Sequence, residues 1–175
     1  MKNISRLGFL VLIIVIALGS CKKDPKKEQI KAISNLESEL YGAQAMDRDK
    51  GLHMIDSYLG FSEQYPNDTL SASYLFKAGE IAMNLQLGTQ AIFYYDKILS
   101  NFPSFHKIPE CIFLKAFIFE NQLGDLNKAK QFYEMFIERY PNHSLSNDAK
   151  ASLEYLGLSP EALIKIFQEK NGEMN

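Results

Sequence analysis

Three aromatic-proline pairs recur at nearly equal intervals along the chain, and this spacing limits the fold more than any other feature of the sequence. The pairs are Tyr65-Pro66, Phe102-Pro103 and Tyr140-Pro141, and their prolines lie 37 and 38 residues apart. An amphipathic stretch precedes each pair, and a repeat of this length is typical of stacked helical hairpins. Because proline cannot continue a helix interior, we predict an all-α chain in which each pair ends the second helix of a hairpin.

The three pairs define three units with shared features. Counting back from each proline as position 32 of a 34-residue unit gives the units 35–68, 72–105 and 110–143. Small residues recur at positions 8 and 20, where two helices have to approach closely, and an aromatic residue recurs at position 24. The small residues are Gly42, Gly79, Ala91 and Ala129, the aromatics are Tyr58, Tyr95 and Tyr133, and the exceptions are Met54 and Phe117.

This pattern resembles the tetratricopeptide repeat, whose units have small residues at 8 and 20, an aromatic at 24 and proline at 32. The third unit is the most similar, and the first could instead be a plain helical hairpin. The chain has no tryptophan, which the family often carries at position 4. The resemblance implies an all-α solenoid of about three hairpins, and a solenoid of this kind typically offers a binding surface without catalysing a reaction.

Beyond the third unit, the sequence predicts two further helices that cap the solenoid over residues 144–170. The first extends from Leu145 to Leu156, and the second begins at Ser159-Pro160-Glu161, with an N-cap residue, a first-turn proline and an acid near the helix N-terminus. A cap is needed because the last repeat would otherwise expose an apolar face. We expect the second capping helix to bury a stripe formed by Ala162, Leu163, Ile166 and Phe167.

The first twenty residues have the pattern of a secretory signal peptide. Lys2 and Arg6 precede an apolar run over residues 7–18, which is too short to span a bilayer. The sequence Leu18-Gly19-Ser20-Cys21 then resembles the bacterial lipobox, which implies cleavage after residue 20 and a lipid on Cys21. An ordinary signal peptide that has a cysteine beyond its cleavage site is the alternative.

Residues 21–27 are rich in lysine and contain a proline, so we interpret them as a tether, and residues 28–175 as one helical domain. The chain that remains after residue 20 has 17 basic and 21 acidic side chains, and this balance argues against nucleic-acid binding. The lipoprotein resemblance implies the outer membrane, because Lys22 rather than an aspartate follows the cysteine. We expect the domain to face the periplasm, and exposure at the cell surface is the alternative.

The tetratricopeptide resemblance also implies a groove lined by the first helix of each unit. An apolar groove suits an amphipathic helix or an extended apolar peptide, so we predict a protein or peptide of the cell envelope as the partner. The alternative is that the chain's own N-terminal helix or C-terminal cap covers this stripe. The predicted partner-binding residues are Glu39, Met46, Phe76, Glu80, Met83, Leu114, Ile118 and Asn121.

No residue pattern predicts catalysis, a cofactor or a metal site. The three histidines lie in different units, and Cys111 has no second cysteine within the helical domain, so we expect a buried apolar role for its side chain. Over most of its length the chain resembles small tetratricopeptide lipoproteins of Gram-negative bacteria, and distantly the one in the outer-membrane barrel assembly machine. We therefore predict a non-enzymatic adaptor, with an envelope glycan-binding module as the alternative.

Overall fold

The computed structural model describes residues 24–42 and 47–172, and this part of the chain folds into helices without any strand. The prediction of an all-α hairpin solenoid is therefore confirmed. The helices are α2 (Pro25–Tyr41), α3 (Arg48–Gln64), α4 (Thr69–Asn84), α5 (Gly88–Asn101), α6 (Ile108–Asn121), α7 (Leu126–Arg139), α8 (Ser146–Tyr155) and α9 (Pro160–Gly172).

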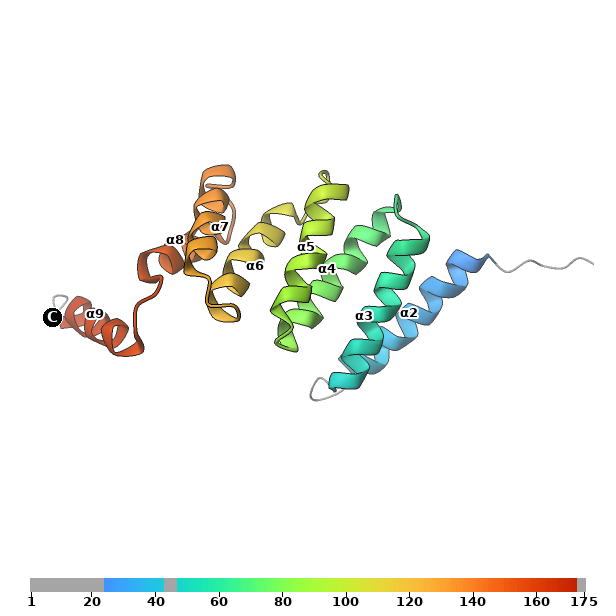
Figure 1. Ribbon diagram of the computed structural model, residues 1–175, viewed down its shortest axis with the longest axis horizontal. Helices are drawn as coiled ribbons and strands as arrows, with labels where there is room; N and C mark the ends of the chain where they lie inside the picture. Colours follow the sequence, from blue (N-terminus) through green and yellow to red (C-terminus); the bar gives the residue numbers. More distant parts are fainter. Residues whose placement is uncertain (1–23, 43–46, 173–175) are drawn as a thin grey trace, which may run out of the picture.

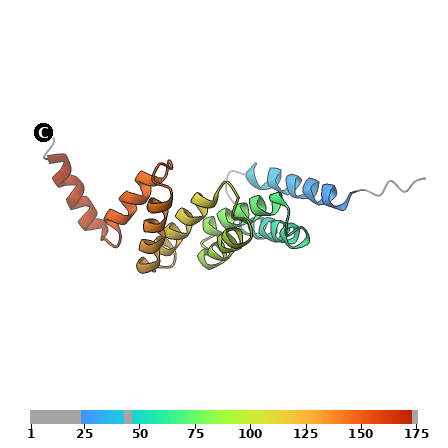
Figure 2. The same ribbon diagram turned by 90° about the horizontal axis from the view of Figure 1, so that it is seen from above.

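The helices stack in chain order along one axis. Each of the helices from α2 to α7 packs against the next one, and α2 and α9 lie at opposite ends of the stack (Figure 1). The same order is visible from above, where α9 extends away from the other helices (Figure 2). Residues that are distant in the sequence therefore meet only where successive hairpins touch.

The aromatic-proline pairs mark the ends of the second helices, as the sequence predicted. Tyr65, Phe102 and Tyr140 are the C-cap residues of α3, α5 and α7, and each proline follows directly.

The first helices of the hairpins begin at different distances from these joints. The helix α2 begins at Pro25, with the Asp24 side chain accepting a hydrogen bond from the Lys26 backbone N–H. Residues 25–27 of the expected tether are thus helical, because they have a cap at Asp24 and an ion pair between Lys26 and Asp68.

The position-24 tyrosines fill the space between neighbouring helices, and all three are fully buried. Tyr58 donates a hydrogen bond to Glu37 over 2.7 Å, and Tyr133 donates one to Glu120 over 2.8 Å. The Tyr95 hydroxyl has no hydrogen-bond partner among the described residues. Burial raises the pKa of all three phenols, so each remains protonated at neutral pH.

This difference predicts opposite effects for the same substitution at equivalent positions. Tyr58→Phe and Tyr133→Phe should each lower the free energy of unfolding by about 1–2 kcal/mol, because each removes a hydrogen bond to a carboxylate. Tyr95→Phe should leave it unchanged or raise it by up to about 1 kcal/mol, because it removes a buried hydroxyl without a partner. Urea unfolding of the three variants provides the comparison, and a loss at Tyr95 as large as at the other two would contradict it.

The small residue at position 8 of the second unit permits a close helix contact. A Cβ atom added at Gly79 of α4 would lie 2.6 Å from a ring carbon of Tyr95 on α5. Ala91 and Ala129, at position 20 of their units, are fully buried. The small residues thus allow the two helices of a hairpin to approach closely, as the sequence pattern predicted.

The C-terminal helices differ in how well they pack. Ala149 of α8 is buried, and α8 packs against α7. In α9, Ala162, Leu163 and Ile166 are half-buried. Phe167 contacts Tyr155 with ring centroids 5.6 Å apart, yet it is 49% exposed. The expected buried stripe is therefore incomplete, because α9 extends away from the other helices of the described residues (Figure 2).

Candidate partner-binding surface

The residues predicted to line the groove lie on α2, α4 and α6, with different exposures. Glu39 and Asn121 are exposed near the ends of α2 and α6. Glu80, Met83 and Leu114 are half-buried, and Met46 lies outside the described residues. Phe76 and Ile118 are buried, with exposed fractions of 4% and 0%. The structure thus leaves only part of the predicted set accessible to a partner.

Phe76 is covered by the chain itself. Its ring lies 5.7 Å from that of Tyr95 and 6.2 Å from that of Phe105, measured between centroids. The Lys107 ammonium lies 4.4 Å from the Phe76 ring centroid, in a cation-π arrangement. A partner could reach Phe76 only by displacing these side chains.

Ile118 also fills space between hairpins. A Cβ atom added at Gly88, at the start of α5, would lie 3.0 Å from a methyl carbon of Ile118. Phe76 and Ile118 are therefore covered by the chain, through α5 and the segment that follows it rather than through the N-terminal helix or the C-terminal cap. The exposed and half-buried members of the set stay as predictions for partner contact.

The half-buried part of the predicted groove contains the carboxyl group of Glu80, whose pKa is raised. Burial raises the pKa of Glu80, while the positive charges of Lys107 and Lys77 oppose the shift. Lys77 donates to Glu37 over 2.6 Å, so its ammonium group is already held by another carboxylate. The accessible part of the predicted groove therefore combines the half-buried Met83 and Leu114 with the polar side chains of Glu39, Glu80 and Asn121.

Cys111 is buried, as predicted, with no exposed surface. Burial raises the pKa of its thiol to about 12, so the thiolate needed for nucleophilic attack is scarce at neutral pH. In a Cys21→Ser chain, we expect Cys111 to react with Ellman's reagent at pH 8 at least about a hundredfold more slowly in the folded protein than in urea. Equal rates in the two conditions would place Cys111 at the surface.

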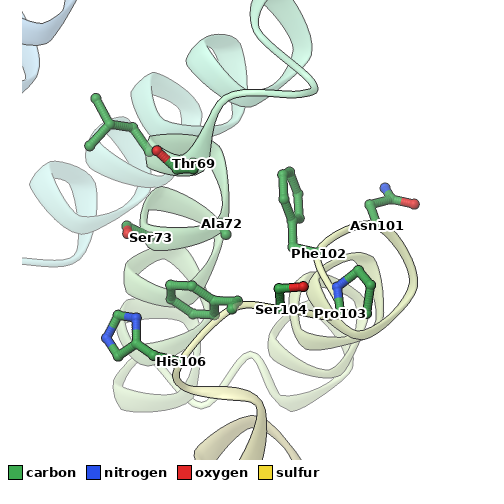
Figure 3. A pocket seen from close by; sticks show the side chains of 10 residues that line it. Thr69, Ala72, Ser73, Asn101, Phe102, Pro103, Ser104 and His106 are labelled. Atoms are coloured by element: carbon green, nitrogen blue, oxygen red, sulfur yellow. The ribbon is translucent and has the colours of Figure 1, made fainter.

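A pocket of about 460 Å³ lies between the first turn of α4 and the segment that joins α5 to α6. Thr69, Ala72 and Ser73 are on one side of it, and Phe102, Pro103 and Ser104 are on the other (Figure 3). Sequence reasoning missed this pocket and treated Phe102-Pro103 only as a helix end. The second aromatic ring three residues later, Phe105, was the available signal. The complete lining is Thr69, Leu70, Ala72, Ser73, Asn101, Phe102, Pro103, Ser104, Phe105 and His106.

Among the described residues, no group of three or more His, Cys, Asp or Glu side chains is arranged to hold a metal ion. Within residues 24–42 and 47–172, no helix is both long and apolar enough to cross a membrane.

Comparison with known proteins identifies one of the three units. The sequence model of the family described as tetratricopeptide repeat matches residues 110–143, the limits that we predicted for the third unit. These residues include the hairpin of α6 and α7. No curated protein matches the chain. The chain therefore contains a tetratricopeptide repeat, within a solenoid whose earlier hairpins have the same architecture.

Proposed function

We propose that this protein is a lipid-anchored, non-enzymatic adaptor that binds another protein at the cell envelope. The tetratricopeptide match at residues 110–143 carries the proposal, because this repeat is typical of protein-protein interaction modules. The stack of hairpins supports it by presenting one long surface on a rigid scaffold (Figure 1). A role in outer-membrane protein assembly is the form of this function that the resemblance noted above favours.

The proposed anchor lies close to the first hairpin. Cys21 is outside the described residues, but only Lys22 and Lys23 separate it from Asp24, which caps α2. Lys26 forms an ion pair with Asp68, the N-cap residue of α4. A lipid on Cys21 would therefore hold the α2 end of the solenoid near the bilayer, with α9 at the other end.

Metabolic labelling tests the anchor. Cells that express the full chain should incorporate labelled palmitate into the protein, and the Cys21→Ala variant should remain unlabelled and leave the membrane fraction. A Cys111→Ala variant is the matched control, because it removes the other cysteine and should keep the label. Label that persists after Cys21→Ala would contradict the anchor.

Photo-crosslinking in living cells tests the adaptor role. A photoreactive residue at Glu39 or Asn121, which are exposed, should form a covalent adduct with one discrete polypeptide. The same residue at Lys130, exposed on α7, reports contacts outside the predicted groove. Recovery of the chain as an unmodified monomer from every position would count against an adaptor role.

A further inference from the structure

The three aromatic-proline joints lie on one edge of the solenoid, but the side chains around them differ (Figure 1). At the first joint, the Lys26 ammonium of α2 lies 5.8 Å from the centroid of the Tyr65 ring, and it also pairs with Asp68. At the third joint, the His143 ring lies edge-on against Phe136, with centroids 5.5 Å apart. At these two joints the chain's own side chains lie against the aromatic cluster, and at the second joint the His106 ring likewise lies edge-on against Phe105, with centroids 4.7 Å apart.

The second joint also opens into the pocket of about 460 Å³. The α4 helix begins at Thr69, so it has no N-terminal extension comparable to the first turns of α2. The Phe102 side chain stands between the first turn of α4 and the end of α5, with Ala72 on the opposite wall (Figure 3). This volume is within the range of about 300–1,000 Å³ that is usual for ligand sites.

The rim of this pocket carries polar side chains that neither donate a hydrogen bond to any other residue in the described part of the chain nor accept one. Their neighbour Ser71 on α4, by contrast, donates a hydrogen bond to the Tyr65 carbonyl over 2.6 Å. Around the pocket, hydroxyl, amide and imidazole groups are therefore available to a ligand. The group is Thr69, Ser73, Asn101, Ser104 and His106.

We propose that this pocket binds an extended, uncharged segment of a partner protein, with one large apolar side chain between Phe102 and the first turn of α4. The peptide groups on either side of that side chain exchange hydrogen bonds with the unpaired rim. This inference rests on the proposed adaptor function and places one of its contacts outside the predicted groove.

The chemistry of the pocket selects this occupant. His106 is its one ionisable lining residue, so a charged ligand would lose hydration without gaining a strong counter-charge. A lipid chain would cover the rim hydroxyls without replacing their hydrogen bonds to water. A sugar has hydroxyls around its whole ring and would press some of them against Phe102 and Phe105. A peptide combines apolar side chains with donors and acceptors in its backbone.

Binding of defined peptides to the full chain in lipid nanodiscs tests the proposal. The probe is a blocked, fluorescein-labelled hexapeptide, Gly-Ser-Leu-Phe-Ser-Gly, and the reference peptide has two alanines in place of Leu-Phe. Fluorescence anisotropy should show at least about tenfold tighter binding of the Leu-Phe peptide, because it buries a large apolar side chain. Equal affinities for the two peptides would overturn the proposal.

Two substitutions locate the binding. Ser73→Trp fills the pocket from its α4 wall and should weaken the Leu-Phe peptide at least about tenfold, and the matched Ser100→Trp should change affinity less than about twofold. Ser100 is exposed on α5 and does not line the pocket. Ser104→Trp is the second blocking variant, in the exposed segment between α5 and α6, and it keeps the test decisive if Ser73→Trp fails to fold.

The remaining outcomes separate this proposal from the adaptor function. Unchanged binding in Ser104→Trp would overturn the pocket assignment, and so would displacement of the peptide by the N-acetylglucosamine tetramer, which would assign the pocket to a glycan. Adducts at Glu39 or Asn121 that form normally in the Ser73→Trp and Ser104→Trp chains would leave the adaptor function standing without this pocket. If no polypeptide adduct forms even in the chain without these Trp substitutions, the adaptor function itself would be contradicted.

Discussion

Replacing Asp96 with alanine should lower the free energy of unfolding by about 2–3 kcal/mol, because it leaves a buried ammonium group without its anion. The side chain of Lys115 on α6 is 7% exposed, and its Nζ atom pairs with the Asp96 carboxylate on α5. The same ammonium lies 4.1 Å from the centroid of the Phe132 ring. Asp96 is 51% exposed, and water therefore reduces the loss below that of a fully buried pair.

Two further variants make this test specific. Glu134→Ala breaks a surface pair with Lys130, whose side chains are 53% and 59% exposed, and it should change the unfolding free energy by less than about 0.5 kcal/mol. Adding Lys115→Met to Asp96→Ala removes the buried charge as well and should recover most of the lost stability. Urea denaturation of the four chains gives these differences. An Asp96→Ala effect no larger than that of Glu134→Ala would mean that solvent reaches Lys115.

Replacing Gly79 with alanine should lower the free energy of unfolding by about 1–3 kcal/mol, although alanine is the better helix former. The added methyl group would lie 2.6 Å from a ring carbon of Tyr95, far inside van der Waals contact. Tyr95 is fully buried and its ring packs against Phe76, so the ring has no free space into which it can move. The contact between α4 and α5 would have to widen.

Gly60 provides the matched control for this substitution. It is exposed in α3, and a Cβ atom added there would meet no other atom within 4 Å. Gly60→Ala should therefore raise the unfolding free energy by about 0.5–1 kcal/mol, through reduced backbone freedom in the unfolded chain. Thermal or urea unfolding should show opposite signs for the two substitutions. A stabilising Gly79→Ala would show that the α4–α5 contact is looser than the structure indicates.

The hairpin joints could be predicted from the sequence because they depend on local chemistry that recurs. Pro141 cannot continue a helix interior, so α7 ends before it, with Tyr140 as the C-cap residue, and the spacing to Tyr133 places that aromatic on the inner face of the same helix. These rules need no knowledge of neighbouring hairpins. For the same reason, the limits of the third unit agreed with the family match.

The exposure of the groove residues depends on how successive hairpins sit against one another, and the sequence pattern does not contain this information. Phe76 was placed on the correct helix, but the segment after α5, at the end of the same unit, brings Phe105 and Lys107 against it. Ile118 is buried because Gly88 lets α5 approach α6. The pocket beside Phe102 also arises between elements, where the first turn of α4 faces the segment after α5, and this tertiary contact is not written in the repeat pattern.

The contact pattern of the solenoid has a consequence for how stability is distributed along the chain. Each helix from α2 to α8 packs against its sequence neighbours, and few contacts join distant parts. Opening one end therefore breaks a single interface, whereas opening the middle breaks two. The protein behaves like a row of linked cooperative units, with α9 as its least protected member and the central hairpins, which hold the pocket, as the last to open.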